Sequence, residues 1–234
     1  MIEALRGQRE SISGLCGGSD CVLELYHKAP MELDVACFGL DSAGRLSDEQ
    51  YFVFYNQKQS PEQAVCLSAG VATGSERFTL SLGKLPSKIS KLSFAVSIDG
   101  THTMRELEKG YVRLLSGQTE MLRFSYSGAE FSGERAIVIC EIYRKGDDWR
   151  FCAVGRGFNG GLKALIESYG GSVASPTPAQ PPAAPVPAGT ADGPVPPACP
   201  AGGIRAGAPR RPANPAFQKG VRPLHAAVRT GVGN

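Results

Sequence analysis

The stretch that decides the fold reads Ala136-Ile-Val-Ile-Cys-Glu-Ile-Tyr-Arg144 and then, after Lys145-Gly-Asp, Asp148-Trp-Arg-Phe-Cys-Ala-Val-Gly-Arg-Gly-Phe-Asn-Gly-Gly-Leu162. Both runs are rich in β-branched and aromatic residues, and turn residues separate them, which is the pattern of a β-hairpin. We expect a hairpin that is buried largely on both faces, with Trp149 as a large core anchor. Strand alternation places Ile137, Ile139 and Glu141 on one face and Val138 and Cys140 on the other.

The chain before this hairpin repeats the same strand pattern. Seven more runs enriched in Val, Ile, Phe, Tyr and Thr are separated by turn residues such as Asp99-Gly100 and Ser127-Gly128. Nine short strands at this spacing predict a mainly β protein, a two-sheet antiparallel β-sandwich with one or two short helices. The seven runs lie near residues 21–26, 32–40, 51–55, 76–82, 91–98, 111–115 and 121–126.

A helix is expected directly after the hairpin. Asn159 stands where a side chain would cap the helix, and Gly170-Gly171 suits the left-handed residue that ends one. A second short helix is expected around Met104–Glu108. The apolar face of the first helix recurs at helical spacing and consists of Leu162, Leu165, Ile166 and Tyr169.

Composition divides the chain near residue 171. Fourteen of the 17 prolines follow Gly171, and the tail is otherwise rich in Ala. Such a segment cannot bury enough apolar surface to offset its ordering entropy. We therefore expect a folded domain over residues 1–171 and a disordered Pro/Ala-rich C-terminal tail over 172–234.

Charge follows the same division. Residues 1–170 carry 19 Lys and Arg against 21 Asp and Glu, whereas residues 171–234 carry six against one. The basic balance of the chain thus belongs to the tail, and the nearly neutral domain lacks the electrostatic footprint of phosphate binding. We expect no specific nucleic acid partner, and a tail that contacts acidic surfaces weakly.

Cysteine usage and the N-terminus indicate the compartment. The odd number of cysteines, the lack of a CxxC pair and the apolar neighbours of several thiols predict reduced, buried thiols without zinc or disulfides. The start Met1-Ile-Glu-Ala-Leu-Arg6 lacks the apolar core of a signal peptide. We expect a soluble, cytoplasmic protein. The seven cysteines are Cys16, Cys21, Cys37, Cys66, Cys140, Cys152 and Cys199.

One motif invites an enzymatic interpretation. Gly155-Arg-Gly-Phe-Asn-Gly160 fits the dinucleotide fingerprint GxGxxG, but a second parallel strand and a later acidic residue should follow. The domain ends instead, so a structural glycine turn is the better interpretation. A Cys–His pair between His102 and Cys37, Cys66 or Cys140 stays open as a weaker hypothesis. We expect no enzyme.

The closing block resembles that of the tellurium-resistance (TerD) family of stress proteins, whose pattern there reads roughly AmifgElYR…geWkfkAvGqGyngGL. Three upstream segments agree with the family in order and spacing, so the resemblance covers about residues 2–170. They are Glu32-Leu-Asp-Val-Ala-Cys-Phe38, Tyr51-Phe-Val-Phe-Tyr-Asn56 and Tyr111-Val-Arg-Leu114. The resemblance implies a calcium-binding β-sandwich that acts in bacterial stress responses, with cytoplasmic and membrane-associated partners in stress complexes and without a settled catalytic activity.

The chain departs from its family at the calcium ligands. Calcium takes roughly six to eight oxygen ligands, several of them carboxylates. The loop that is acidic in typical members reads Ser68-Ala-Gly-Val-Ala-Thr-Gly-Ser-Glu76 here and is nearly stripped of carboxylates. What remains would form one weak Ca²⁺ site at most. The candidate ligands, by resemblance, are Glu32, Asp34, Asn56 and Glu76.

Two functions follow from this. In the first, the protein is a non-enzymatic stress-response protein of tellurite-resistance type with residual weak calcium binding. In the second, it is a metal-free adaptor module that assembles a stress complex through its exposed loops and tail. A direct calcium titration distinguishes them.

Overall fold

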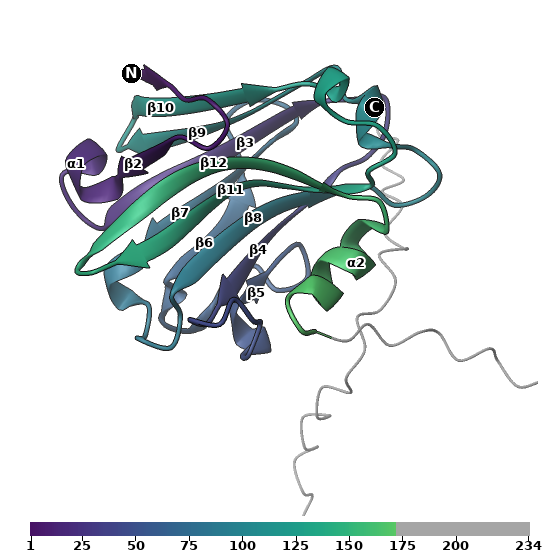
Figure 1. Ribbon diagram of the computed structural model, residues 1–234. Helices are drawn as coiled ribbons and strands as arrows, with labels where there is room; N and C mark the ends of the chain where they lie inside the picture. Colours follow the sequence, from purple (N-terminus) through teal and green to yellow (C-terminus); the bar gives the residue numbers. More distant parts are fainter. Residues whose placement is uncertain (172–234) are drawn as a thin grey trace, which may run out of the picture.

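The computed structural model describes residues 1–171, so the expected tail lies outside the described residues. Two six-stranded sheets pack face to face in this part of the chain (Figure 1). The first sheet runs in the order β1-β10-β9-β3-β7-β6 and the second in the order β2-β12-β11-β8-β4-β5. All pairs are antiparallel except β1 with β10. The predicted mainly β, two-sheet sandwich is therefore confirmed.

The strands have the following bounds. Those of the first sheet are β1 (Ile2–Glu3), β10 (Thr119–Tyr126), β9 (Lys109–Ser116), β3 (Asp20–Lys28), β7 (Ser75–Ser81) and β6 (Val65–Ala69). Those of the second sheet are β2 (Arg9–Ser11), β12 (Asp148–Phe158), β11 (Ala136–Lys145), β8 (Lys91–Ser97), β4 (Asp34–Leu40) and β5 (Phe52–Val53). The sequence missed β1, β2 and β6, and it made β5 longer than it is.

The closing hairpin of β11 and β12 forms as predicted, but its alternation was predicted wrongly. The register of β11 shifts between Val138 and Cys140 against both of its neighbours, so an extra residue stands in the strand as a β-bulge. Ile139 and Cys140 consequently both belong to the core between the sheets. Glu141 moves to the other face, where its carboxylate lies 3.1 Å from Lys91 Nζ.

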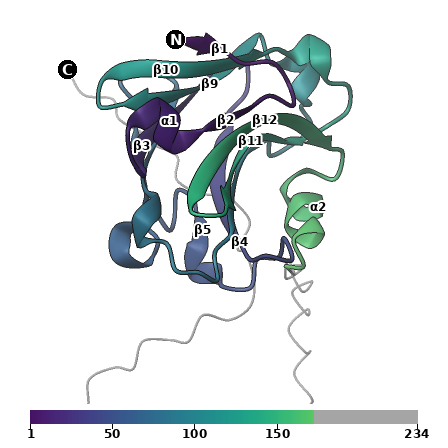
Figure 2. The same ribbon diagram turned by 60° about the vertical axis from the view of Figure 1, so that its left-hand side comes forward.

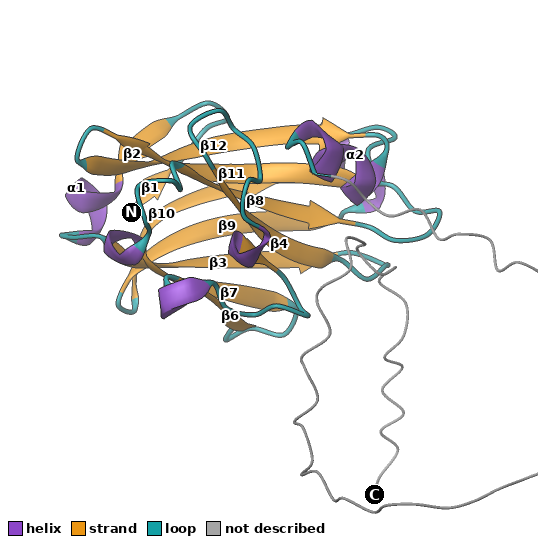
Figure 3. Cartoon of the chain, turned by 90° about the horizontal axis from the view of Figure 1, so that it is seen from below, coloured by secondary structure: helices purple, strands orange, loops and turns teal. Residues whose placement is uncertain are grey.

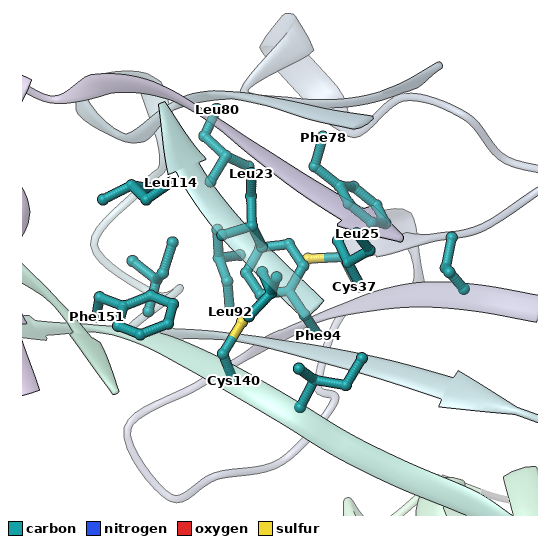
Figure 4. Packing of buried hydrophobic residues seen from close by; sticks show 14 of the residues in the cluster. Leu23, Leu25, Cys37, Phe78, Leu80, Leu92, Phe94, Leu114, Cys140 and Phe151 are labelled. Atoms are coloured by element: carbon teal, nitrogen blue, oxygen red, sulfur yellow. The ribbon is translucent and has the colours of Figure 1, made fainter. Parts of the chain in front are cut away.

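The main core fills the space between the two sheets (Figure 4). Phe78 of β7 and Phe94 of β8 meet there edge to face, with ring centroids 5.2 Å apart. A second, smaller apolar cluster lies on the outer side of the second sheet, where Phe38 and Val138 pack with Leu165 and Tyr169. Buried apolar area on both sides of one sheet explains why β11 and β4 read as nearly continuous apolar runs.

Helix α2 (Gly161–Ser168) covers this second cluster (Figure 2). The helix was predicted, but Asn159 is not its cap, because Gly160 holds that position without a side-chain hydrogen bond. The second predicted helix is a 3₁₀ turn over Met104–Glu106. The sequence missed α1 (Ile12–Cys16), which lies at the other end of the molecule from α2 (Figure 3). Among residues 1–171, none of the helices combines the length and apolarity that a membrane span requires.

Candidate functional site

A pocket of about 510 Å³ opens at one end of the sandwich, and we refer to it as the end pocket. Three segments build it: the end of β3 with the loop into β4, the loop between β5 and β6, and the β6–β7 hairpin. Its lining is half apolar and half polar. The lining residues are His27, Ala29, Met31, Leu33, Val35, Tyr55, Lys58, Leu67, Ser68, Ala69, Gly74, Ser75 and Glu76.

Two of the predicted ligands approach each other at this end. Asp34 opens β4 in the second sheet, opposite Ser97, whereas Glu76 lies in β7 of the first sheet, opposite Leu25 and Ala69. Sandwich packing brings these two strands together although they belong to different sheets. Asp34 is close enough for its charge to raise the pKa of Glu76.

Glu76 is the most perturbed acid of this site. Burial and the negative charge of Asp34 raise the pKa of Glu76 to about 7, although the positive charge of Lys58 acts in the opposite direction. One of its carboxylate oxygens, Oε2, is buried and has no hydrogen-bond partner. A buried carboxylate oxygen without a partner is costly, so the side chain has an unused capacity to accept a proton or a cation.

Asp34 is perturbed in the same direction. Its partial burial, and then the charges of Asp99 and Glu32, raise the pKa of Asp34 above its usual value. Asp34 stands beside the end pocket, because its neighbours Leu33 and Val35 line the pocket whereas Asp34 itself does not. Glu32 is exposed and also lies outside the lining. It thus contributes charge to the site, and no contact of its carboxylate with Glu76 is formed in the described part of the chain.

Asn56 does not join the site as predicted. It stands exposed in the turn between Phe54 and Gln57 and is absent from the lining of the end pocket. The neighbouring Gln57 amide is occupied, because it donates to the carbonyls of Glu49, Gln50 and Phe52. The predicted ion loop is also shorter than expected, since β6 extends to Ala69 and β7 begins at Ser75.

Sequence reasoning missed two polar groups of the end pocket, Lys58 and His27. The ammonium of Lys58 partly offsets the carboxylates and lowers the pKa of Glu76. Burial lowers the pKa of His27 to about 4, so the ring is neutral near pH 7, and its Nε2 lies 2.6 Å from the hydroxyl of Tyr126. Neither residue stands in a motif, so only the pairing of the strands could place them here.

The carboxylates at this end of the sandwich are too few for a typical calcium site. Within residues 1–171, no three His, Cys, Asp or Glu side chains gather closely enough to hold a metal ion. Two carboxylates, Asp34 and Glu76, are far fewer than the roughly six to eight oxygens of a calcium site. An ion would therefore keep most of its water here, and the residues fit weak binding only.

The weaker Cys–His hypothesis finds no geometric support in residues 1–171. The ring of His102 lies on the surface with its Nδ1 2.8 Å from Glu106. Cys37 and Cys140 are fully buried in the main core, and the thiol of Cys66 donates to the carbonyl of Gln63. The prediction of buried thiols holds for Cys21, Cys37 and Cys140, but Cys16, Cys66 and Cys152 are only partly buried, and Cys199 lies outside the described residues.

The glycine motif is not a nucleotide site of the Rossmann type. Gly155 and Gly157 lie inside β12, which runs antiparallel to β11, and Gly155 takes a positive φ of 65° beside the bulge. A side chain at Gly157 would collide with Glu134. The glycines serve the bend and the close packing of the hairpin.

These features define a class: a two-layer β-sandwich with one covering helix and, at its end, a pocket whose lining mixes polar and apolar residues. The TerD domain matches residues 9–169, so the chain belongs to the TerD family.

Relatives and a solved structure agree with this assignment. The uncharacterized protein YceE of Bacillus subtilis is 34% identical over 150 residues, which cover 59% of this chain and 78% of that protein. The tellurium resistance protein TerA of an Alcaligenes species is 40% identical over 134 residues, 56% of this chain but 38% of TerA. General stress protein 16U of Bacillus subtilis is 31% identical over 150 residues, 59% of this chain and 77% of that protein. A crystal structure of a TerD homologue from Streptomyces coelicolor superposes with a TM-score of 0.51 at 21% identity, over 66% of this chain and 99% of that one, and supports the fold.

Proposed function

We propose that this protein is a non-enzymatic bacterial stress-response protein of the tellurite-resistance type, and that its end pocket binds one Ca²⁺ ion weakly. Membership of the TerD family supports the first part, as do the names of a tellurium resistance protein and a general stress protein among the relatives. The observation that carries the second part is the buried, unpartnered Oε2 of Glu76 next to the charge of Asp34.

Both acids are disfavoured in their ionised forms: Glu76 by burial and the charge of Asp34, and Asp34 by burial and the charges of Asp99 and Glu32. A cation beside them would relieve that cost. In this proposal Asp34 and Glu76 are the protein ligands, and Glu32 and Asp99 add long-range negative charge. The short ligand set and Lys58 limit the affinity, because each missing carboxylate removes both a ligand and a countercharge.

A calcium titration followed by calorimetry and by thermal unfolding tests the proposal. We expect millimolar Ca²⁺ to raise the melting temperature, chelator to lower it, and both Asp34→Asn and Glu76→Gln to abolish the response. Glu167→Gln on the surface of α2 is the matched control, because it removes one exposed charge away from the pocket. Identical melting curves with calcium and with chelator would reject calcium binding.

One observation favours a second function, a metal-free adaptor. Lys58 already places an ammonium in the end pocket, and the rest of the lining includes Met31, Leu33 and Leu67. Such a pocket suits a partner side chain as well as an ion. In this version the protein joins other stress-complex proteins in the cytoplasm, some of them membrane-associated, and the basic tail contacts acidic surfaces weakly.

Substitution of Lys58 separates the two functions. If the pocket is a weak calcium site, Lys58→Gln removes a competing positive charge and should raise the calcium affinity by roughly tenfold, the equivalent of about 1.4 kcal/mol. If the pocket serves only protein contacts, neither the parent protein nor Lys58→Gln should bind calcium.

A further inference from the structure

Two cysteines lie at the corner between α1 and β3, at the opposite end of β3 from the end pocket. Cys16 is the last residue of α1, and Cys21 is the second residue of β3. The turn between them begins with Gly17, whose φ of 73° caps the helix. Both side chains pack against the main core, but Cys21 is buried with 5% exposure whereas Cys16 is partly exposed.

The two side chains are neighbours at this corner, since both pack against the main core where α1 ends and β3 begins. Hydrogen bonding between the two thiols lowers the pKa of Cys16 and raises the pKa of Cys21. Burial acts in the same sense on Cys21 and keeps it protonated. Both cysteines are free thiols, so the pair combines a partly exposed thiol that ionises first with a neighbouring buried thiol that stays protonated.

We propose that Cys16 and Cys21 form an oxidation site, which closes into an intramolecular disulfide when a two-electron oxidant such as hydrogen peroxide reaches Cys16. This arrangement is that of a peroxidatic thiol beside a resolving thiol. It rests on the geometry of the α1–β3 corner and is independent of the function proposed above.

Hydrogen peroxide supplies the two-electron oxidation that joins the two thiols. The Cys16 thiolate attacks one peroxide oxygen, the O–O bond breaks, and the leaving hydroxide takes a proton to become water, which leaves a sulfenic acid. The sulfur of Cys21 then attacks the sulfur of Cys16 and the S–O bond breaks. The departing hydroxide takes the proton of Cys21. Two thiols are oxidised to one disulfide, and one peroxide is reduced to two waters.

The other buried thiols of the main core cannot react in this way. Cys37 of β4 and Cys140 of β11 both stand opposite Phe94 of β8, on either side of it (Figure 4). Two strand spacings separate them, roughly 9–10 Å between backbones, which exceeds the ~7 Å that a disulfide can span between Cα atoms. Cys66 and Cys152 lie in different sheets, and their thiols point to the carbonyls of Gln63 and Ala153.

The corner has room to adjust when the bond forms. A Cβ atom added at Gly17 or at Gly18 would meet no other atom within 4 Å, so the turn is uncrowded. The hydroxyl of Ser116 in β9 holds the carbonyl of Cys16 at 3.2 Å, which keeps the end of α1 in place. The disulfide would therefore fix α1 to β3 without disturbing the end pocket, which lies at the other end of β3.

Peptide mapping of the whole chain tests the proposal directly. The reduced protein is treated with hydrogen peroxide, its remaining thiols are alkylated, and it is digested with trypsin, which releases residues 10–28 as one peptide with both cysteines. We expect this peptide to carry no alkyl group and to be two hydrogens lighter than the reduced peptide. Reduction before alkylation should restore both alkyl groups.

Two variants complete the test. Cys21→Ser should stop the reaction at a sulfenic acid on Cys16, which dimedone traps, whereas Cys66→Ser should leave the disulfide in the 10–28 peptide unchanged. The proposal is overturned if this peptide stays fully alkylated at a peroxide dose that oxidises Cys66 or Cys152. It is equally overturned if Cys16 pairs with another cysteine. The mapping of the parent protein decides the question even if Cys21→Ser does not fold.

Discussion

Glu76 is held in its neutral form more readily by the folded protein than by the unfolded chain. Its pKa of about 7 lies above the ordinary value of 4.5 because of burial and the charge of Asp34. Between pH 4.5 and about pH 7, the folded state therefore keeps a proton on Glu76 that the unfolded state has already lost. The contribution of protonated Glu76 to stability is fully present below about pH 4.5 and is lost as the pH rises through about 7.

Glu76→Gln should consequently stabilise the calcium-free protein at alkaline pH. The amide cannot ionise, so at about pH 8 we expect a gain of about 2–3 kcal/mol in the free energy of unfolding, which shrinks as the pH falls toward 5. Urea denaturation of both proteins across this range measures the difference. A gain that does not depend on pH would contradict the assignment.

Glu24 is a fully buried acid, and it lies on the outer face of the first sheet. Its side chain has 0% exposure, and the guanidinium groups of Arg77 and Arg113 bind its two oxygens, with Arg77 Nη2 2.8 Å from Oε2. Arg113 also contacts Glu120, and Glu120 in turn contacts Arg123. The result is an alternating ladder of charge across β7, β3, β9 and β10.

Glu24→Gln should destabilise the fold by about 2–4 kcal/mol, because two partly buried guanidinium groups lose their countercharge. The matched control is Glu108→Gln. Its partner Lys28 is on the surface, and the two side chains are 53% and 64% exposed, so a change below about 0.5 kcal/mol is expected there. Urea denaturation at neutral pH would show whether the two losses differ; equal losses would argue against the ladder as a stabilising unit.

At the scale of elements, α2 is needed because the second sheet is apolar on both sides. The bulge in β11 directs Ile139 and Cys140 to the main core while Val138 stays in the cluster under α2. Without the helix, this cluster would expose a large apolar patch to water. The helix depends on this packing in return, since eight residues without a side-chain cap are too few for a stable isolated helix.

Leu165→Ala tests this mutual dependence. Leu165 has 0% exposure in the cluster under α2, and its truncation should cost about 2–4 kcal/mol of unfolding free energy. Lys163→Ala, on the exposed side of the same helix, should change the stability by less than about 0.5 kcal/mol. Thermal and urea unfolding measure both, and a small loss for Leu165→Ala would mean that α2 is only loosely docked.

At the scale of the whole molecule, the described part carries its own core. Both apolar clusters are built from residues between Ala4 and Tyr169, and the chain after residue 171 contributes a net charge of +5 by sequence. Removal of residues 172–234 should therefore leave the melting temperature within about 2 °C and shift the isoelectric point to the acidic side. Loss of cooperative unfolding in calorimetry would show that the domain boundary is wrong.

The elements that the sequence predicted are those with strong local signals. β3, β4 and β7–β12 are rich in β-branched and aromatic residues, and α2 has a clear apolar face, so composition and period suffice. β6 was missed because Val65-Cys-Leu-Ser-Ala69 contains few strong strand formers, and β1 and β2 because so few residues carry no pattern. These three strands exist through their pairing with β7, β10 and β12.

The sequence by itself determined the sandwich, the hairpin with its helix, the family and the compositional boundary near residue 171, because each of these follows from local pattern or composition. Only the tertiary structure decided that Asp34 and Glu76 approach each other, that Lys58 joins them and that Asn56 does not. It also brought Cys16 and Cys21 to the same corner of the core and turned Glu141 away from the core. Contacts of this kind depend on strand register, on a bulge and on the packing of two sheets, and these are set by neighbours distant in the chain.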